Sequence, residues 1–419
     1  MSASIPQLTE AGWISDPAAA AVLDALEAAG GAGCVRFVGG CVRNAIMGRP
    51  VADIDLATVL EPDAVTAALE AAGLKAVPTG VDHGTVTAVS GGRGFEITTL
   101  RRDVETDGRR AVVAFSRDWT EDAARRDFTL NALYADRTGQ VFDPTGEGLA
   151  AARAGRIVFV GDAERRIRED HLRILRFFRF LAHYGRGDPD AAALAACETH
   201  ASSLANLPAE RIQKELLSLL SAPDPRPAVR LMAATGVLSR ILPFAGDLSR
   251  LEGCCEVEVL DGTAPDPVLR LGALLPEAPG DVAREAERLR LSGAHRDRLV
   301  AAAGREPRLT SWMSTRQTRR ALHLLGAAVV QDRLRMAWAR APHGPAARDW
   351  KTHLALSRSW TPRTLGLSGA DVLAAGAPPG PRVGEILREL ETWWMDEDFP
   401  EDPDVVREGL AAVLRGLGA

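Results

Sequence analysis

The chain has 419 residues and a formal net charge of −6, with 46% hydrophobic and 25% charged residues. This composition is ordinary for a globular protein, and the length favours about two to four compact units. Without an apolar run of roughly 18 residues or a secretory signal, we expect a cytoplasmic protein with no membrane contact and no obligate protein partner. The five cysteines form no CxxC pair, which predicts buried free thiols rather than a zinc site.

The first 145 residues mix helix and strand patterns, with turns at glycine and proline. An alanine-rich segment at 17–29 predicts a helix that Ser15 or Asp16 caps. A second helix is expected at Pro62–Ala72. Strands are expected at Cys34–Val38, Ile54–Val59, Thr85–Ser90, Gly94–Leu100 and Ala111–Ser116.

After Pro144 the strand patterns mostly stop and helical periodicity dominates. We expect helices at Ala163–Tyr184, Pro208–Ser221, Arg226–Ala234, Asp281–Leu291, Thr315–Arg340 and Gly384–Met395. The sequence therefore predicts an α/β head followed by an all-helical remainder.

Two aspartates, Asp53 and Asp55, flank Ile54 in the second expected strand. Side chains alternate along a strand, so both carboxylates point to one face while Ile54 points to the core. Close carboxylates repel each other unless a cation lies between them, and Mg²⁺ prefers carboxylate and phosphate oxygens. The pair predicts a site for two Mg²⁺ ions, although this pattern alone is more often a surface loop.

Two adjacent glycines, Gly39 and Gly40, lie upstream between an expected strand and helix, and Arg43 follows them. Adjacent glycines let the backbone approach a triphosphate, whose oxygens the amide N–H groups can bind. Arg43 can add a charge-assisted contact. A plain turn with a surface arginine is the alternative, but the order and spacing relative to Asp53 favour a nucleotide site.

A third carboxylate is expected on a neighbouring strand, and Glu96 fits. Period two places Phe95 and Ile97 on one face of that strand and Glu96 on the other. A solvent-facing glutamate is the alternative, because half-buried strands alternate in this way routinely.

The segment Arg153–Arg186 holds nine arginines and four acidic residues. Four of its charged residues recur every third position and form a slowly winding stripe on one expected helix: Asp170, Arg173, Arg176 and Arg179. An aspartate accepts from an exocyclic amine and an arginine donates to ring acceptors, so such a pair can accept C and A while rejecting G and U. A solvated salt-bridge stripe is the alternative.

As an ordered set, these motifs resemble a known family. The chain reads GGCVRN from Gly39, DID from Asp53, FEITTLRRD from Phe95, RRDFTLNALY from Arg125 and REDHLRILRFFRF from Arg168. The set is similar to that of class II CCA-adding enzymes and bacterial poly(A) polymerases, a branch of the polymerase β-like nucleotidyltransferases. The resemblance covers about residues 33–220 well and the remainder loosely.

The resemblance implies roles for single residues. It places Mg²⁺ on Asp53 and Asp55, and the triphosphate at Gly40 and Arg43. Further nucleotide contacts are implied for Arg126, Asp127 near the ribose, Asp170 and Arg173 as base readers, and Arg176 and Arg179 beyond them. The family usually has aspartate where this chain has Asn44, which is nearly isosteric but uncharged, so a role of that aspartate in positioning Arg43 does not carry over to this chain as it stands.

The implied fold class is α+β, with a nucleotidyltransferase head at 1–145, a neck with the base-recognition helix at 146–222, a body at 223–340 and a tRNA-binding tail at 341–419. Residues Asp103–Arg117 would be the mobile loop that the family uses to switch from C to A.

The implied activity is addition of C, C and A to the 3′ end of tRNA, from CTP and ATP, with release of pyrophosphate. A poly(A) polymerase is one alternative, but Leu56–Val65 lacks the basic residues usual in such enzymes. An enzyme that adds only CC or only A is another. A non-catalytic RNA-binding protein is the third, against which the intact Asp53 and Asp55 argue.

Overall fold

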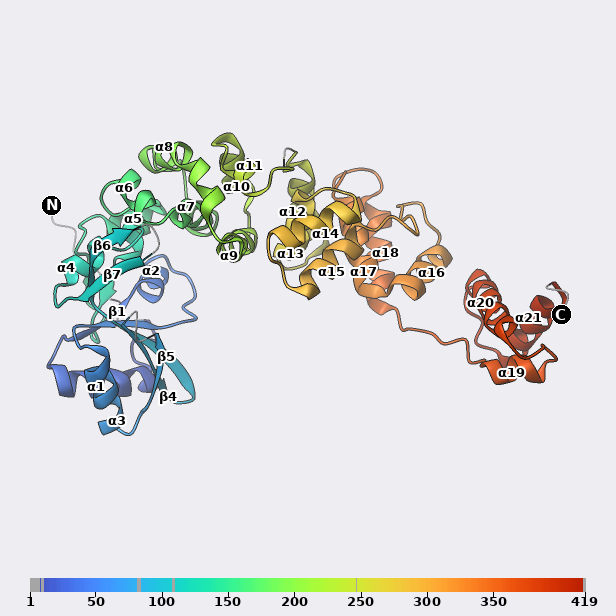
Figure 1. Ribbon diagram of the computed structural model, residues 1–419, viewed down its shortest axis with the longest axis horizontal. Helices are drawn as coiled ribbons and strands as arrows, with labels where there is room; N and C mark the ends of the chain where they lie inside the picture. Colours follow the sequence, from blue (N-terminus) through green and yellow to red (C-terminus); the bar gives the residue numbers. More distant parts are fainter. Residues whose placement is uncertain (1–7, 9–10, 81–83, 108–109, 246, 417–419) are drawn as a thin grey trace. The chain divides into compact units, whose positions relative to one another are not determined.

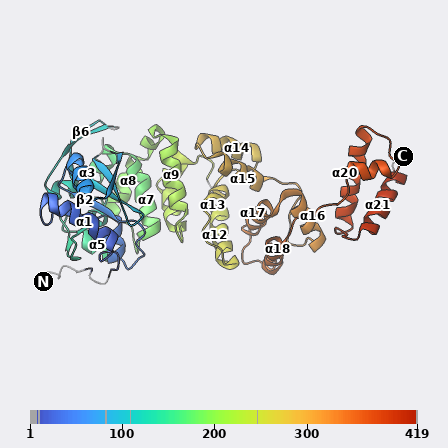
Figure 2. The same cartoon turned by 90° about the horizontal axis from the view of Figure 1, so that it is seen from below.

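The computed structural model describes residues 8, 11–80, 84–107, 110–245 and 247–416. The chain forms two compact units, Met1–Pro243 and Phe244–Ala419. All strands assigned in these described residues belong to the first unit, as the blue and green segments of Figures 1 and 2 show. The expected change from mixed α and β structure to helices is confirmed. None of the described helices is long and apolar enough to cross a membrane.

A mixed seven-stranded sheet forms the base of the first unit, in the order β3-β4-β5-β2-β1-β8-β9. Neighbouring strands are antiparallel except β2 and β5, which are parallel. The strands are β1 Val35–Val38, β2 Asp55–Thr58, β3 Lys75–Gly80, β4 Thr85–Ser90, β5 Arg93–Thr99, β8 Tyr134–Ala135 and β9 Val141–Phe142. The sequence analysis missed β3, in which no residue is buried and apolar and polar residues do not alternate.

Two helices, α1 (Pro17–Gly30) and α3 (Pro62–Ala71), pack against each other and against the sheet. Asp16 caps α1 by accepting a hydrogen bond from the amide of Ala18 at 2.8 Å, as expected. The buried face of α1 includes Val22 and Leu26, and burial of each such side chain contributes about 1.5–3 kcal/mol. This layer holds the sheet that carries the aspartates.

A second, two-stranded sheet consists of β6 (Arg101–Asp107) and β7 (Arg110–Phe115). The strand expected at Ala111–Ser116 is confirmed within one residue. The segment Asp103–Arg117 is thus largely a hairpin rather than an irregular loop, and residues 108–109 lie outside the described residues. Its movement during a nucleotide switch stays a prediction.

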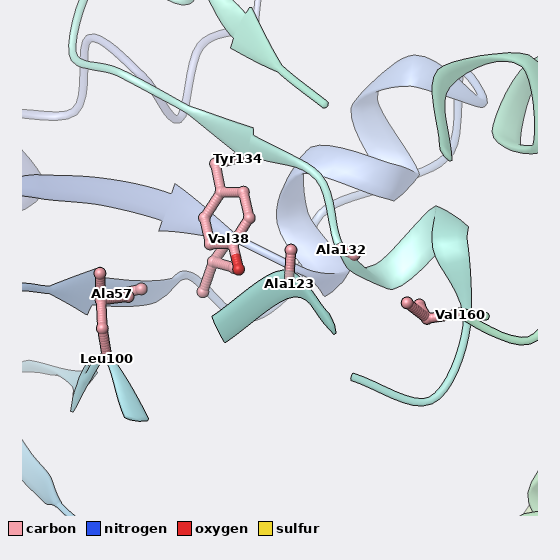
Figure 3. Packing of buried hydrophobic residues seen from close by; sticks show 7 residues of the cluster. All are labelled: Val38, Ala57, Leu100, Ala123, Ala132, Tyr134 and Val160. Atoms are coloured by element: carbon pink, nitrogen blue, oxygen red, sulfur yellow. The ribbon is translucent and has the colours of Figure 1, made fainter. Parts of the chain in front are cut away.

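A compact apolar cluster joins the sheet to the segments that follow it (Figure 3). Its buried members come from β1, β2, helix α4 (Trp119–Ala124), β8 and the connecting segments: Val38, Ala57, Leu100, Ala123, Ala132, Tyr134 and Val160. The cluster therefore fixes α4 and the residues after it against the strand that carries Asp55.

The rest of the first unit is helical: α5 Gly148–Ala154, α6 Ala163–Glu169, α7 Leu172–Tyr184, α8 Ala191–Thr199, α9 Ala209–Leu220, α10 Arg226–Ala234 and α11 Val237–Ile241. The single helix expected at Ala163–Tyr184 is wrong, because the chain leaves the helical conformation at Asp170, with φ −153°. The Asp170 carboxylate accepts from the amide of Leu172 at 3.1 Å. Such local bonding by aspartate competes with helical continuation.

The second unit contains α12 Ser249–Asp261, α13 Pro267–Leu274, α14 Pro279–Arg288, α15 Gly293–Ala303, α16 Thr315–Leu325, α17 Ala327–Trp338, α18 Ala347–Ser359, α19 Gly369–Ala374, α20 Pro381–Asp396 and α21 Pro403–Gly416. The expected helix Thr315–Arg340 is two helices, since Gly326 ends α16 at φ +80°. All five cysteines are free and buried, as predicted.

Candidate active site

Three carboxylates meet at one end of the parallel pair β2 and β5. Asp55 opens β2 and is the register partner of Glu96 in β5, while Asp53 precedes the strand by two residues. Between the aspartates, Ile54 is buried in the core, as expected from alternation. Asp55 is half-buried, whereas Asp53 and Glu96 are exposed to solvent. These three residues are called the carboxylate cluster below.

Burial raises the pKa of Asp55, and the charges of Glu96 and Asp53 raise it further, against the opposing charge of Arg126. Glu96 and Asp53 therefore each repel Asp55, and a divalent cation would relieve that repulsion. Among the described residues, no group of three histidine, cysteine or acidic side chains is arranged as a metal site by itself. The oxygen donors of the cluster nevertheless fit Mg²⁺, which combines one or two carboxylates with substrate phosphates.

The glycine turn lies directly before helix α2 (Gly40–Ile46). Gly39 has φ +69° and ψ −115°, a conformation that only glycine adopts readily. A Cβ atom placed on Gly39 would lie 3.6 Å from Nη1 of Arg126. The turn, the first amide N–H groups of α2 and Arg126 are therefore neighbours, and those amides have no acceptor within their own helix.

Arg43 lies in α2 with only 7% of its surface exposed. Its guanidinium donates to Oδ1 of Asn131 at 2.7 Å, the hydroxyl of Tyr184 at 2.7 Å, and Oδ1 of Asn44 at 2.9 and 3.1 Å. All these acceptors are neutral, and burial lowers the pKa of Arg43. Its charge is thus paired with no carboxylate in the part of the chain that the structure describes.

The departure at Asn44 has a structural explanation. Its Oδ1 accepts from Arg43, and its Nδ2 donates to the carbonyl of Pro50 at 2.9 Å. An aspartate could accept from Arg43 but could not donate to Pro50. The neutral amide therefore positions the arginine without cancelling its charge. The sequence analysis missed Asn131 and Tyr184, which no spacing links to Arg43.

Arg126 is held by Asp122, which the sequence analysis also missed. Two guanidinium nitrogens donate to Oδ2 of Asp122 at 2.9 and 3.1 Å, and the Tyr134 hydroxyl donates to the same oxygen at 2.7 Å. Arg125 donates to the other carboxylate oxygen at 3.0 Å. Burial raises the pKa of Asp122, but the charges of Arg126 and Arg125 outweigh it and leave the pKa lowered. The spacing of four between Asp122 and Arg126 could have signalled this pair.

The arginines at the end of the charged stripe lie on α7 and form ion pairs with acidic residues that the sequence did not identify as their partners. Arg176 forms an ion pair with the buried Asp127. Arg179 pairs with Glu215 at 2.8 Å. The proposed stripe thus continues into the protein interior rather than over a solvated helix face.

The two expected base readers are paired with other residues. Asp170 accepts from Arg211 of α9 at 2.8 Å. Arg173 donates to Glu169 at 2.7 Å and to the carbonyl of Arg166 at 2.8 Å. Asp170 and Arg173 therefore do not form the fixed pair expected from a continuous helix, because the chain breaks at Asp170. Their base-reading role stays a prediction.

Comparison with known proteins decides the family. Residues 35–158 match the family described as "Poly A polymerase head domain", and residues 188–248 match "Probable RNA and SrmB- binding site of polymerase A". The chain is 32% identical over 378 residues to "CCA tRNA nucleotidyltransferase 1, mitochondrial" of Mus musculus, which spans 88% of this chain and 85% of the relative. The chain belongs to the CCA tRNA nucleotidyltransferase family.

Bacterial members of the CCA tRNA nucleotidyltransferase family are similar to the same extent. The "CCA-adding enzyme" of Geobacillus stearothermophilus is 32% identical over 371 residues, which cover 84% of this chain and 86% of that enzyme. The solved Bacillus stearothermophilus CCA-adding enzyme in complex with CTP superposes with a TM-score of 0.75 at 26% identity, covering 96% of this chain and all of that one. The predicted α+β fold and family resemblance are confirmed.

Proposed function

We propose that the protein adds C, C and A to the 3′ end of tRNA from CTP and ATP, releasing pyrophosphate. One observation carries the proposal: the carboxylate cluster lies beside a glycine turn and Arg126 in a member of the CCA tRNA nucleotidyltransferase family. Carboxylates, backbone amides and arginines are the groups that phosphoryl transfer requires, because positioning and charge neutralisation supply most of the catalysis.

Each part of the site has a proposed task. Asp53 and Asp55 would hold Mg²⁺, with Glu96 as a third acid. When bound, Mg²⁺ would increase the acidity of the tRNA 3′-hydroxyl and neutralise charge on the phosphates. The turn at Gly39 and Gly40 offers amide N–H groups to the triphosphate.

The arginines supply fixed positive charge around the same substrate. Arg126 is oriented by Asp122, next to the turn. The hydrogen-bond acceptors of Arg43 are neutral, so no direct ion pair with them cancels its charge, and Asp127 attracts it without a hydrogen bond. Arg176 holds Asp127, which we propose lies near the ribose, and Arg179 continues the same row.

Base selection would fall to Asp170 and Arg173. Each forms an ion pair, Asp170 with Arg211 and Arg173 with Glu169, and Arg173 also donates to the carbonyl of Arg166. We propose that the incoming base replaces these partners, with its amine donating to Asp170 and its ring acceptor receiving from Arg173. Cytosine and adenine both offer this combination.

The proposed parts are a head at 1–145, a neck at 146–222, a body at 223–340 and a tail at 341–419 that binds tRNA. The cytoplasmic location expected from the sequence also stays a proposal, which cell fractionation would test.

The deciding experiment uses the purified protein, a tRNA transcript lacking its CCA end, Mg²⁺, and CTP and ATP singly or together. A two-nucleotide extension with CTP alone, and three with both followed by a stop, is the expected result. A long ladder from ATP alone would identify a poly(A) polymerase, and a stop after CC or after A alone would identify a partial enzyme. No extension would leave only RNA binding.

A further inference from the structure

The second unit contains a cavity of about 650 Å³, in the size range of nucleotide and cofactor sites. It opens among α12, α13, α15 and α17, beside the segment 304–312 that joins α15 to α16. Apolar side chains that are almost completely buried line its interior, including Leu269, Leu299 and Trp350. The carboxylate cluster belongs to the first unit, so this cavity is a separate feature.

Positive charge dominates the lining of the cavity although the whole chain is acidic. Five arginines and two glutamates line it, an excess of three positive charges. Glu277 is shared by Arg340 at 2.7 Å, Arg305 at 3.7 Å and Arg250 at 3.9 Å. One carboxylate cannot neutralise three guanidinium groups, so a net positive field remains there.

Two further arginines add to this field. Arg333 donates to the carbonyl groups of Ala301 and Glu306, which leaves its charge uncompensated by those contacts. Gly304 permits the close approach, since a Cβ there would lie 1.9 Å from Nη2 of Arg333. Arg308 is exposed and has no hydrogen bond or ion pair among the described residues.

An aromatic ring completes the rim. Trp312 is 79% exposed, and within the described chain it packs against no other aromatic ring and beneath no guanidinium. Trp312 and Arg308 also border a neighbouring hollow of about 270 Å³. An exposed indole beside guanidinium groups that carry an excess of positive charge is the combination that binds a base by stacking and its phosphate by charge.

We propose that this cavity is a second nucleotide-unit site, which takes a base against Trp312 and its phosphate among Arg308, Arg305 and Arg340. The nucleotide unit could come from a free nucleotide or from bound RNA, and the chemistry of recognition is the same for both. The proposal does not depend on the transfer reaction assigned to the first unit.

The test compares the full-length protein with the double variant Trp312→Ala/Arg308→Ser. Both side chains are exposed, so the thermal unfolding temperature should not change. The matched control is Phe244→Ala, which removes another exposed aromatic ring outside the cavity. Two probes are used on each protein, ATP by calorimetry and a tRNA transcript lacking CCA by equilibrium binding at one fixed salt concentration.

If free nucleotides occupy the cavity, the wild type binds two ATP molecules per chain and the double variant binds one. If an RNA nucleotide occupies it, all proteins bind one ATP, and the double variant binds the transcript about tenfold more weakly than wild type, whereas Phe244→Ala binds normally. Unchanged ATP stoichiometry together with unchanged transcript affinity would overturn the proposal, as would equal losses in the control. Nucleotide addition at saturating tRNA is recorded separately, so its failure would count against the proposed function alone.

Discussion

At Asp55, burial and two neighbouring acids all raise the pKa of the carboxyl group. The raised pKa means that the folded protein holds a proton on Asp55 more tightly than the unfolded chain does. Stability from this group is therefore present below its unfolded pKa and is lost as pH rises through the folded one. At neutral pH the ionised cluster costs stability that substrate and cation would offset.

Asp55→Asn should therefore separate stability from activity. Without divalent cations we expect the free energy of unfolding of the variant to rise by about 0.5–2 kcal/mol, because one of three neighbouring negative charges is gone. Its unfolding temperature should rise accordingly. Nucleotide addition should fall below detection. Thermal unfolding and the transcript extension assay measure the two effects, and an active variant would remove Asp55 from the proposed chemistry.

The pKa of Asp122 is shifted in the opposite direction from that of Asp55. Its lowered pKa contributes stability that is present above the unfolded pKa of about 3.9 and is lost as pH falls from there through the lower pKa of the folded protein. Asp122→Asn leaves the guanidinium of Arg126 without its anion, which should cost about 3–5 kcal/mol near neutral pH.

Urea unfolding at pH 7 and pH 3.5 would check this prediction. The gap between the unfolding free energies of wild type and Asp122→Asn should narrow at pH 3.5, because Asp122 takes up a proton more readily in the unfolded chain than in the folded protein. The KM for CTP should also rise, because Arg126 is no longer oriented. The exposed Asp63→Asn serves as the control, and an equal loss in both variants would argue against a special role of Asp122.

At the scale of elements, the glycine turn and the broken helix show how local geometry shapes the site. The turn depends on a positive φ at Gly39 and faces Arg126. The break between α6 and α7 gives Asp170 an extended backbone and lets it contact Arg211 of α9. An uninterrupted helix would have carried Asp170 in register with Arg173 instead.

Gly39→Ala tests the turn. Its φ of +69° is strained for alanine, which should cost roughly 1–2 kcal/mol, and the turn should bind triphosphate less well. Gly48→Ala is a matched control, since Gly48 has φ +65° and open space around its Cβ position. Both variants should lose similar stability in urea, but only Gly39→Ala should raise the KM for CTP. An unchanged KM would show that the turn does not contact the nucleotide.

Strands β4 and β3 illustrate what periodicity along the sequence can and cannot reveal. The strand predicted at Thr85–Ser90 is confirmed, and its side chains alternate between half-buried and buried positions. The strand at Lys75–Gly80 was missed because it lies at the edge of the sheet and buries little. Edge strands are defined by backbone hydrogen bonds to a neighbour, and a sequence window does not contain that neighbour.

At the scale of the whole molecule, limited proteolysis can test the division of the chain into two units. Phe244 is 64% exposed and follows the last residue of the first unit, Pro243. Limited chymotrypsin digestion should cut after Phe244 and release a first-unit fragment that carries all proposed active-site residues.

Mass spectrometry of the digest checks this prediction. Phe244→Ala should abolish cleavage between the units, while cleavage at the exposed Trp312 continues and serves as the internal control. Fragments that begin within the sheet of the first unit would contradict the division.

The sequence by itself determined the α+β class, the family and the residues of the proposed site. The reason is that the residues typical of this family occur in short motifs in a fixed order along the chain. Alternation placed Asp55 and Glu96 on strands, and a glycine pair marked the turn. These features need only neighbours along the chain.

The tertiary structure alone decided which groups meet. Asn131 and Tyr184 reach Arg43 across 88 and 141 positions of the chain, and Arg211 reaches Asp170 across 41. The same holds for the arginines that share Glu277 in the second unit. Such contacts depend on how helices and strands pack, since charged side chains pair with whatever partner folding brings within hydrogen-bonding distance.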